Sequence, residues 1–115
     1  MVVGASTNPN RYSYKAIFAL TDKGYDVVPL GIKKGNVAGL DIVKGKPELT
    51  DIHTITLYIG PFVQKEYIDY LIRLQPKRII FNPGTENENF IVQCEQNNIE
   101  AVEACTLVLL ATNQY

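Results

Sequence analysis

The stretch VVGASTNPNRYSYKAIFALTDKGYDVVPLGIKKG, residues 2–35, decides the fold. Its apolar start, residues 1–4, predicts a buried strand, and a polar loop then leads into a helix predicted over residues 13–23. Gly24 is a typical C-terminal stop for that helix. The valine-rich residues 25–30 predict a second strand that is buried on both faces. A strand, a loop, a helix and a second strand in this order predict a parallel βαβ unit.

The rest of the chain continues this alternation. Residues 31–50 are rich in glycine and charge, and one extended piece is expected at residues 40–42. Further strands are predicted at residues 54–59, 77–81 and 99–102. Thr85 and Glu88 have the spacing of a capping box at the start of a helix, with Phe90, Ile91 and Cys94 on its inner face. The stretch CTLVLLAT predicts a final short helix or packed tail.

One longer helix is predicted between Gly60 and Pro76. Glycine at the cap and proline at the first helical position favour a helix start at Gly60-Pro61. Apolar residues then recur at helical spacing and predict one buried face. These residues are Val63, Tyr67, Tyr70, Leu71 and Leu74.

Alternating strands and helices predict parallel strands joined by right-handed helical crossovers. We therefore predict an α/β fold of one domain, residues 1–115, built as a doubly wound, Rossmann-like open sheet. About five parallel strands are expected, with helices on both faces.

Composition narrows the classes of function. The 115 residues are 46% apolar and 20% charged, which is ordinary for a globular protein. A net charge of -1 argues against nucleic acid as a partner, because phosphate backbones require a broad basic patch. No stretch is long enough to span a bilayer and no charged-then-apolar leader is evident. We therefore expect a cytoplasmic protein with no membrane partner, and a protein partner or homo-oligomer stays open.

The first loop is a candidate phosphate site. Ligands of doubly wound sheets bind beyond the carboxyl ends of the strands, where Gly4 and Ala5 begin this loop. Glycine lets a ligand approach the backbone, and the following helix offers free N–H groups and a partial positive charge. Ser6 and Thr7 add hydroxyl donors and Arg11 adds a bidentate cation. Alternatively, Gly4 and Ser6 only form the turn and cap of the helix.

The end of the second strand carries a basic pair. NAD sites place Asp or Glu there to hold the ribose hydroxyls. Here Lys33 and Lys34 follow the strand and no acid is present. A phosphorylated ribose suits such a pair, and both NADP and coenzyme A carry one. The other interpretation is a solvated lysine pair on a loop.

Two later loops reach the same edge. Gly60, Pro61 and the following Phe62 can give an adenine a flat apolar wall, or they can serve only to start a helix. Gly84 places another glycine at this edge, beside Glu86 and Glu88. These acids would repel a close phosphate, so we expect this loop to meet a less charged part of the ligand or a small acyl group.

Taken together, these residues resemble the small coenzyme A-binding proteins, and the resemblance covers nearly the whole chain. Their fold is similar to the coenzyme A-binding, Rossmann-like domain of the succinyl-CoA synthetase α subunit. The stretches VVGASTNPNRYSYKAIFALTDKGYDVVPL and NPGTENENFIVQCEQNNIEAVEAC carry it. Where the family commonly has Asn-Pro after the second strand, this chain has Leu30-Gly31. The matching positions are Gly4, Ala5, Ser6, Arg11, Gly24, Tyr25, Gly84 and Cys105.

The resemblance implies binding of coenzyme A or acyl-CoA through the nucleotide end, and it implies no chemistry. No metal or nucleophile motif occurs, so no catalytic or metal residue is predicted. His53 is interpreted as a surface or core-edge residue and Cys94 as a packing residue. Cys105 is either a thiol at the ligand site or a buried structural cysteine. An NADP-linked oxidoreductase and a protein-interaction domain with a vestigial cleft are the alternatives.

Overall fold

The computed structural model describes residues 1–115 and contains a five-stranded sheet in the order β2-β1-β5-β6-β7. All neighbouring strands in it are parallel. The chain pairs β2 on one side of β1 and then crosses to β5 on the other side, so the strand order reverses at β1. The predicted doubly wound α/β sheet is therefore confirmed. Its strands are β1 (Val2–Val3), β2 (Pro29–Leu30), β5 (Thr54–Leu57), β6 (Arg78–Phe81) and β7 (Glu100–Glu103).

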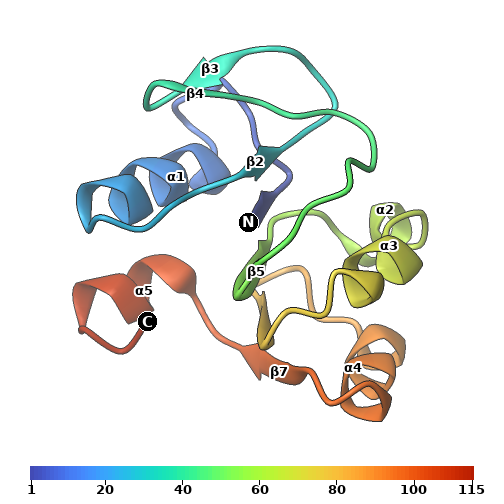
Figure 1. Ribbon diagram of the computed structural model, residues 1–115. Coiled ribbons are helices and arrows are strands. Elements are labelled where there is room, and N and C mark those ends of the chain that lie inside the picture. The colour runs from blue at the N-terminus through green and yellow to red at the C-terminus, as the bar shows by residue number, and fades with distance from the viewer.

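Helices cover both faces of the sheet, as predicted. Figure 1 shows α1 and α5 packed side by side on one face, with α2, α3 and α4 on the other. Their bounds are α1 (Tyr12–Asp22), α2 (Pro61–Gln64), α3 (Ile68–Arg73), α4 (Glu88–Gln96) and α5 (Thr106–Ala111).

The core has two layers, one on each side of the sheet. Ile55 and Leu57 of β5 are fully buried in the larger layer, where Phe81 meets Phe90 of α4 edge to face at 5.2 Å between ring centroids. The smaller layer packs Ile17 of α1 against the sheet and α5. Burial of each such side chain contributes about 1.5–3 kcal/mol. These layers hold the strand ends, and thus the loops beyond them, in fixed positions.

The prediction of one long helix between Gly60 and Pro76 is wrong. This segment forms two short helices, α2 and α3, with a break between them. The predicted apolar residue Val63 is 44% exposed, whereas Gln64 is completely buried. The Gln64 side chain bonds to the carbonyls of Ile59 and Thr85. Tyr67 packs against the core as predicted, and the buried apolar positions begin at Ile68.

The prediction for residues 25–50 needs two corrections. The second strand is only Pro29–Leu30, and the valines before it are half-buried rather than buried on both faces. No helix connects β2 to β5. A small antiparallel hairpin of β3 (Asn36–Val37) and β4 (Leu40–Asp41) lies there instead, so the extended piece expected at residues 40–42 is β4. The hairpin stands above β2 in Figure 1.

The predicted capping box at the start of α4 is also wrong. Asn87 is the N-cap, and its Oδ1 accepts from the Phe90 N–H. Thr85 is buried and donates its hydroxyl to the Asn82 carbonyl at 2.8 Å. The loop after β6 therefore turns on itself before the helix begins.

Candidate functional site

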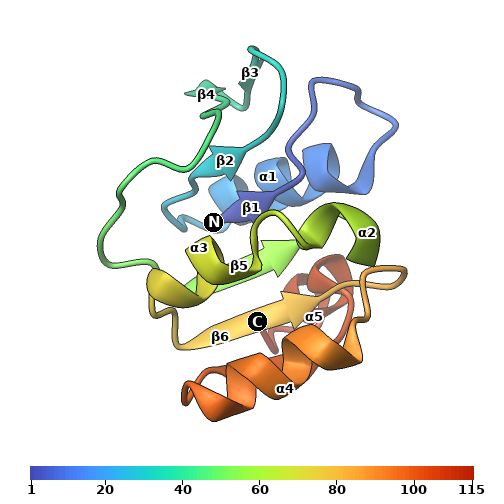
Figure 2. The same ribbon diagram turned by 90° about the vertical axis from the view of Figure 1, so that its right-hand side faces the viewer.

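A cleft of about 540 Å³ lies at the carboxyl ends of the parallel strands. Figure 2 shows the arrowheads of β5 and β6 pointing to this edge, where the loop after β1, the start of α2 and the loop after β6 gather. The structure places nine of the ten predicted binding residues around the cleft, and Pro61 is the exception. The nine are Gly4, Ala5, Ser6, Thr7, Arg11, Lys33, Lys34, Gly60 and Gly84.

The turn after β1 presents unpaired backbone donors. The amides of Gly4 and Ala5 both donate to the Leu30 carbonyl at 2.9 Å. The next two amides, of Ser6 and Thr7, have no acceptor in the protein. The Ser6 Oγ accepts from the Asn8 amide at 3.1 Å, which leaves the Ser6 hydroxyl hydrogen available. Consecutive free N–H groups in a turn form a concavity suited to an anion.

The start of α1 adds donors to the same cleft. Arg11 is the N-cap residue and its side chain makes no capping bond. The first amide of this region that bonds within the helix is that of Lys15, so those of Tyr12 and Ser13 are free. Ser13 lines the cleft while only 3% exposed, and it is a site residue that the sequence did not predict. The positive end of the helix dipole reinforces these donors.

Two glycines let the turns pack this closely. Gly4 has φ +97°, and a Cβ there would lie 3.0 Å from the Tyr58 backbone. A Cβ on Gly31 would lie 2.5 Å from the Ala5 carbonyl oxygen. Gly4 is thus required by contact with the chain after β5, whether or not a ligand approaches it. Gly31 has the same function between β2 and the first turn.

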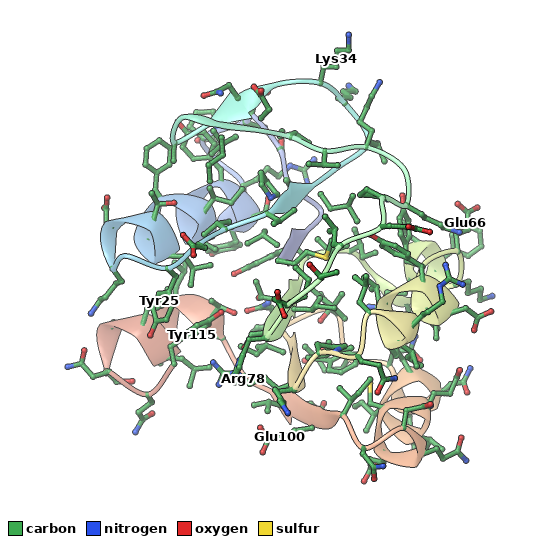
Figure 3. All side chains as sticks on the ribbon, in the orientation of Figure 1. Tyr25, Lys34, Glu66, Arg78, Glu100 and Tyr115 are labelled. Carbon is green, nitrogen blue, oxygen red and sulfur yellow. The ribbon has the colours of Figure 1, made fainter.

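The charges that line the cleft are all positive. Arg11, Lys33 and Lys34 are exposed at its rim, and we call these three residues the basic wall. Lys34 extends from the turn after β2 away from the body of the molecule in Figure 3. No carboxylate, imidazole or thiol lines the cleft. Because unlike charges attract, this wall favours an anionic ligand.

Tyr58 also borders the cleft but offers it no reactive group. Its hydroxyl is buried beside the hydroxyls of Thr56 and Thr106, which bond to each other, and its own oxygen makes no hydrogen bond of good geometry. Burial raises the pKa of Tyr58 to about 12. The phenol is therefore protonated at neutral pH, and it cannot serve there as a base.

The opposite side of the cleft, which we call the far wall, consists of Gly60, Pro83, Gly84 and Thr85. A buried polar side chain that the sequence analysis missed holds it in place. Gln64 Nε2 donates to the carbonyls of Ile59 and Thr85, both at 2.8 Å, and its Oε1 accepts from Asn87 Nδ2 at 2.8 Å. The signal was present in the sequence, because Gln64 falls on the apolar stripe three residues before Tyr67 and seven before Leu71.

Asn82 forms a second buried junction behind the far wall. Its Nδ2 donates to the Leu57 carbonyl at 2.8 Å and to Thr56 Oγ1 at 2.6 Å. Its Oδ1 accepts from the Thr106 amide at 2.8 Å. The side chain thus joins the ends of β5 and β6 to the start of α5. It fixes the position of the loop after β6 relative to the sheet.

The Gly84 amide of the far wall already donates a hydrogen bond to a carboxylate of the protein itself. Glu86 Oε1 accepts from the Gly84 N–H at 2.8 Å. Gly84 has φ +92°, in the left-handed region that favours glycine. A phosphate would have to displace a like charge to bind this amide. Glu86 itself does not line the cleft, but its carboxylate lies beside Gly84, which does. The Gly84 end of the cleft is therefore less favourable to an anion than the basic wall.

The remaining candidates lie outside the cleft. Phe62 is 81% exposed, and Lys65 Nζ lies 5.4 Å from its ring centroid, so it forms no wall of the cleft. His53 is at the opposite, amino edge, with Nδ1 2.8 Å from Thr54 Oγ1. Cys105 is half-buried as the N-cap of α5 and does not line the cleft.

Cys94 belongs to the core, as its predicted packing role requires. Its side chain is fully buried on the inner face of α4, and burial raises the pKa of the thiol to about 11. No group of three or more His, Cys, Asp or Glu side chains is placed to hold a metal ion. The helices are also too short or too polar to cross a membrane.

Comparison with known proteins points to one family. Residues 1–111 match the protein family described as CoA binding domain. A search of curated proteins found no match. A crystal structure described as an uncharacterized protein is 42% identical, with 99% of this chain and 94% of that chain covered and a TM-score of 0.97.

Two further solved structures are more distant. A hypothetical protein from Pyrococcus horikoshii OT3 is 26% identical, with 93% of this chain and 77% of that chain covered and a TM-score of 0.80. A Thermus thermophilus protein is 19% identical over 99% of this chain and 87% of its own, with a TM-score of 0.85. The latter likeness concerns the fold alone.

Proposed function

This chain belongs to the family of CoA-binding domains, and on that premise we propose that it binds coenzyme A or an acyl-CoA without catalysing a reaction. The nucleotide end of the ligand occupies the cleft at the carboxyl edge of the sheet. The observation that carries the proposal is the convergence of unpaired amides and cations on this cleft. The amides of Ser6 and Thr7 and the start of α1 suit a pyrophosphate.

The order of the strands matches the order of groups along coenzyme A. From β2 to β6 the edge presents the lysine pair, the anion-binding turn, Gly60 and then Gly84. Coenzyme A presents a ribose 3′-phosphate, a pyrophosphate, a neutral pantetheine arm and a thiol. Neighbouring strands lie about 4.8 Å apart, so the first and last of these loops are separated by about 14 Å. An extended ligand can follow the edge in this direction.

The chemistry of the cleft supports a binding function. General acid–base catalysis requires a group with a pKa near the working pH within reach of the substrate. The titratable side chains around the cleft are Arg11, two lysines and tyrosines, and the phenol of Tyr58 is buried. No carboxylate, imidazole or thiol is among them.

Calorimetric titration with coenzyme A and dephospho-coenzyme A tests the proposal. The two ligands differ only in the 3′-phosphate, which we expect the lysine pair to contact. Coenzyme A should therefore bind more tightly, by roughly tenfold for one charge-assisted contact. Undetectable binding of both ligands would refute the proposal. Equal binding of both would remove Lys33 and Lys34 from the site.

An NADP-linked oxidoreductase is the second candidate. The exposed pair Lys33 and Lys34 favours it, because a 2′-phosphate has the same charge as a 3′-phosphate. Titration of the same protein with NADPH, followed by turnover assays with carbonyl substrates, separates the two functions. Tighter binding of NADPH together with measurable turnover would favour the oxidoreductase.

A further inference from the structure

We infer that the far wall selects acyl groups that carry no negative charge, with Glu86 as the residue that determines this specificity. The inference rests on the proposed function and deepens it, since it names the acyl class. Three points support it: the position of the acyl end of a bound thioester, the anchoring of Glu86, and the difference in charge between the two ends of the cleft.

The acyl end of a bound thioester lies toward β6. If the pyrophosphate contacts the turn after β1, the pantetheine arm has to leave along the edge. Lys33 and Lys34 of the basic wall are on the β2 side, where the proposed function puts the phosphorylated sugar. The other direction passes Gly60 and ends at Gly84, two strand spacings from β1, or about 10 Å. A pantetheine arm is long enough to bring its thioester to that loop.

Glu86 is held at this position by its neighbours. Thr85, which precedes it, is tied to Gln64 through its carbonyl. Asn87, which follows it, is tied to the same buried side chain through its amide. The carboxylate itself accepts from the Gly84 N–H at 2.8 Å. Although Glu86 is exposed, its backbone is anchored on both sides, so the charge stays beside the loop.

The two ends of the cleft therefore impose opposite charge requirements. Anionic groups are attracted at the basic wall of Arg11, Lys33 and Lys34. At the rim beside Gly84, outside the lining of the cleft, a terminal carboxylate on the acyl group would come close to the exposed carboxylate of Glu86. It would also find the Gly84 amide already engaged. A short neutral acyl group meets neither obstacle, because its thioester needs no anion-binding donor.

Titrations with butyryl-CoA and succinyl-CoA test this inference, because both acyl chains have four carbons and only succinyl carries a terminal carboxylate. Wild-type protein in low salt should bind butyryl-CoA roughly 3- to 10-fold more tightly, the effect expected of two solvated charges a few ångström apart. Glu86→Gln keeps an oxygen for the Gly84 amide and removes the charge, so it should raise succinyl-CoA affinity and leave butyryl-CoA affinity unchanged.

Glu95→Gln is the matched control. It makes the same change in net charge on an exposed residue of α4, about 12 Å further along the helix from the cleft. The preference for butyryl-CoA should survive in this variant. Equal wild-type affinities for the two thioesters, or a preference that persists in Glu86→Gln, would overturn the inference while leaving coenzyme A binding intact. Failure of coenzyme A itself to bind would refute the proposed function and the inference with it.

Discussion

Gln64 Nε2 lies 2.8 Å from the carbonyl oxygen of Thr85 and donates a hydrogen bond to it. A completely buried amide thus joins α2, which follows β5, to the loop that follows β6. The same nitrogen donates to the Ile59 carbonyl. These bonds hold the two loops of the far wall in a fixed position relative to each other.

Gln64→Met should destabilise the fold. Methionine has a similar volume but supplies no donor, so the carbonyls of Ile59 and Thr85 lose their partner in a buried site. We expect a loss of about 2–4 kcal/mol in the free energy of unfolding, measured by urea denaturation. Gln96→Met, at an exposed position of α4, is the control and should change stability by less than about 0.5 kcal/mol. If Gln64→Met lowered the free energy of unfolding no more than Gln96→Met, the Gln64 hydrogen bonds would contribute nothing to stability.

The fold was predictable because local patterns and tertiary packing agree along most of the chain. Residues 54–57 and 78–81 are rich in β-branched and aromatic side chains, and they form β5 and β6 within a residue or two of the predicted ends. Gly24 ends α1 as expected, with φ +86°. Such signals depend only on neighbours in sequence, so they can be read without the structure.

The errors arise where distant residues decide local structure. Gln64 is buried at the end of α2, where its side chain bonds to Thr85, 21 residues away, and the backbone turns after it. Asn87 caps α4 in place of Thr85, whose buried side chain points back toward β6 and donates to the Asn82 carbonyl. The predicted binding residues came together because parallel strands end at one edge. Ser13 was missed because its position at the helix start depends on how the preceding loop folds.

Gly4→Ala should cost more stability than Gly24→Ala. Both glycines have positive φ, at +97° and +86°, so alanine strains the backbone at either position. Only at Gly4 would the added Cβ also approach the Tyr58 backbone, at 3.0 Å. We expect losses of about 2–4 kcal/mol at Gly4 and about 1 kcal/mol at Gly24 in urea denaturation. Similar losses would mean that the turn after β1 relaxes away from β5.

Tyr58→Phe should leave stability at pH 7 unchanged or raise it by about 1 kcal/mol, because the hydroxyl is buried without a partner. The matched control is Tyr70→Phe, which removes a hydrogen bond of 2.6 Å to the Pro47 carbonyl and should cost about 1 kcal/mol. A clear loss of stability in Tyr58→Phe would show that the hydroxyl bonds to its neighbour Thr56 or Thr106 in solution.

The raised pKa of Tyr58 predicts how the stability of the fold changes at alkaline pH. Burial raises the pKa of Tyr58 from 10 to about 12 in the folded protein. The folded state therefore holds this proton more tightly than the unfolded chain, so the contribution is complete below pH 10 and is lost as the pH rises toward 12. Urea denaturation across this range should show a smaller alkaline loss for Tyr58→Phe than for wild type. If the free energies of unfolding of the two proteins fall in parallel over this pH range, the raised pKa of Tyr58 is contradicted.

Arg11→Ala should weaken coenzyme A binding without unfolding the protein. The side chain is exposed and makes no capping bond, so the fold does not depend on it. Loss of a charge-assisted phosphate contact should cost about 1.5–3 kcal/mol, or roughly 10- to 150-fold in Kd by calorimetry. Arg73→Ala, at the exposed end of α3 on the opposite edge, removes the same charge and should retain wild-type affinity. Unchanged affinity in Arg11→Ala would remove Arg11 from the site.

Replacement of both Lys33 and Lys34 by alanine should abolish the preference for coenzyme A over dephospho-coenzyme A. The pair is exposed at the β2 end of the cleft, where the proposed site of the 3′-phosphate lies, so the 3′-phosphate should lose most of the contacts. Affinity for coenzyme A should fall to that of dephospho-coenzyme A, whose own affinity should change little. The slope of log Kd against log salt should also become shallower for coenzyme A, because fewer phosphate–cation contacts are screened. If both ligands weaken equally in the double variant, the lysines act through the general field of the cleft, and the 3′-phosphate lies elsewhere.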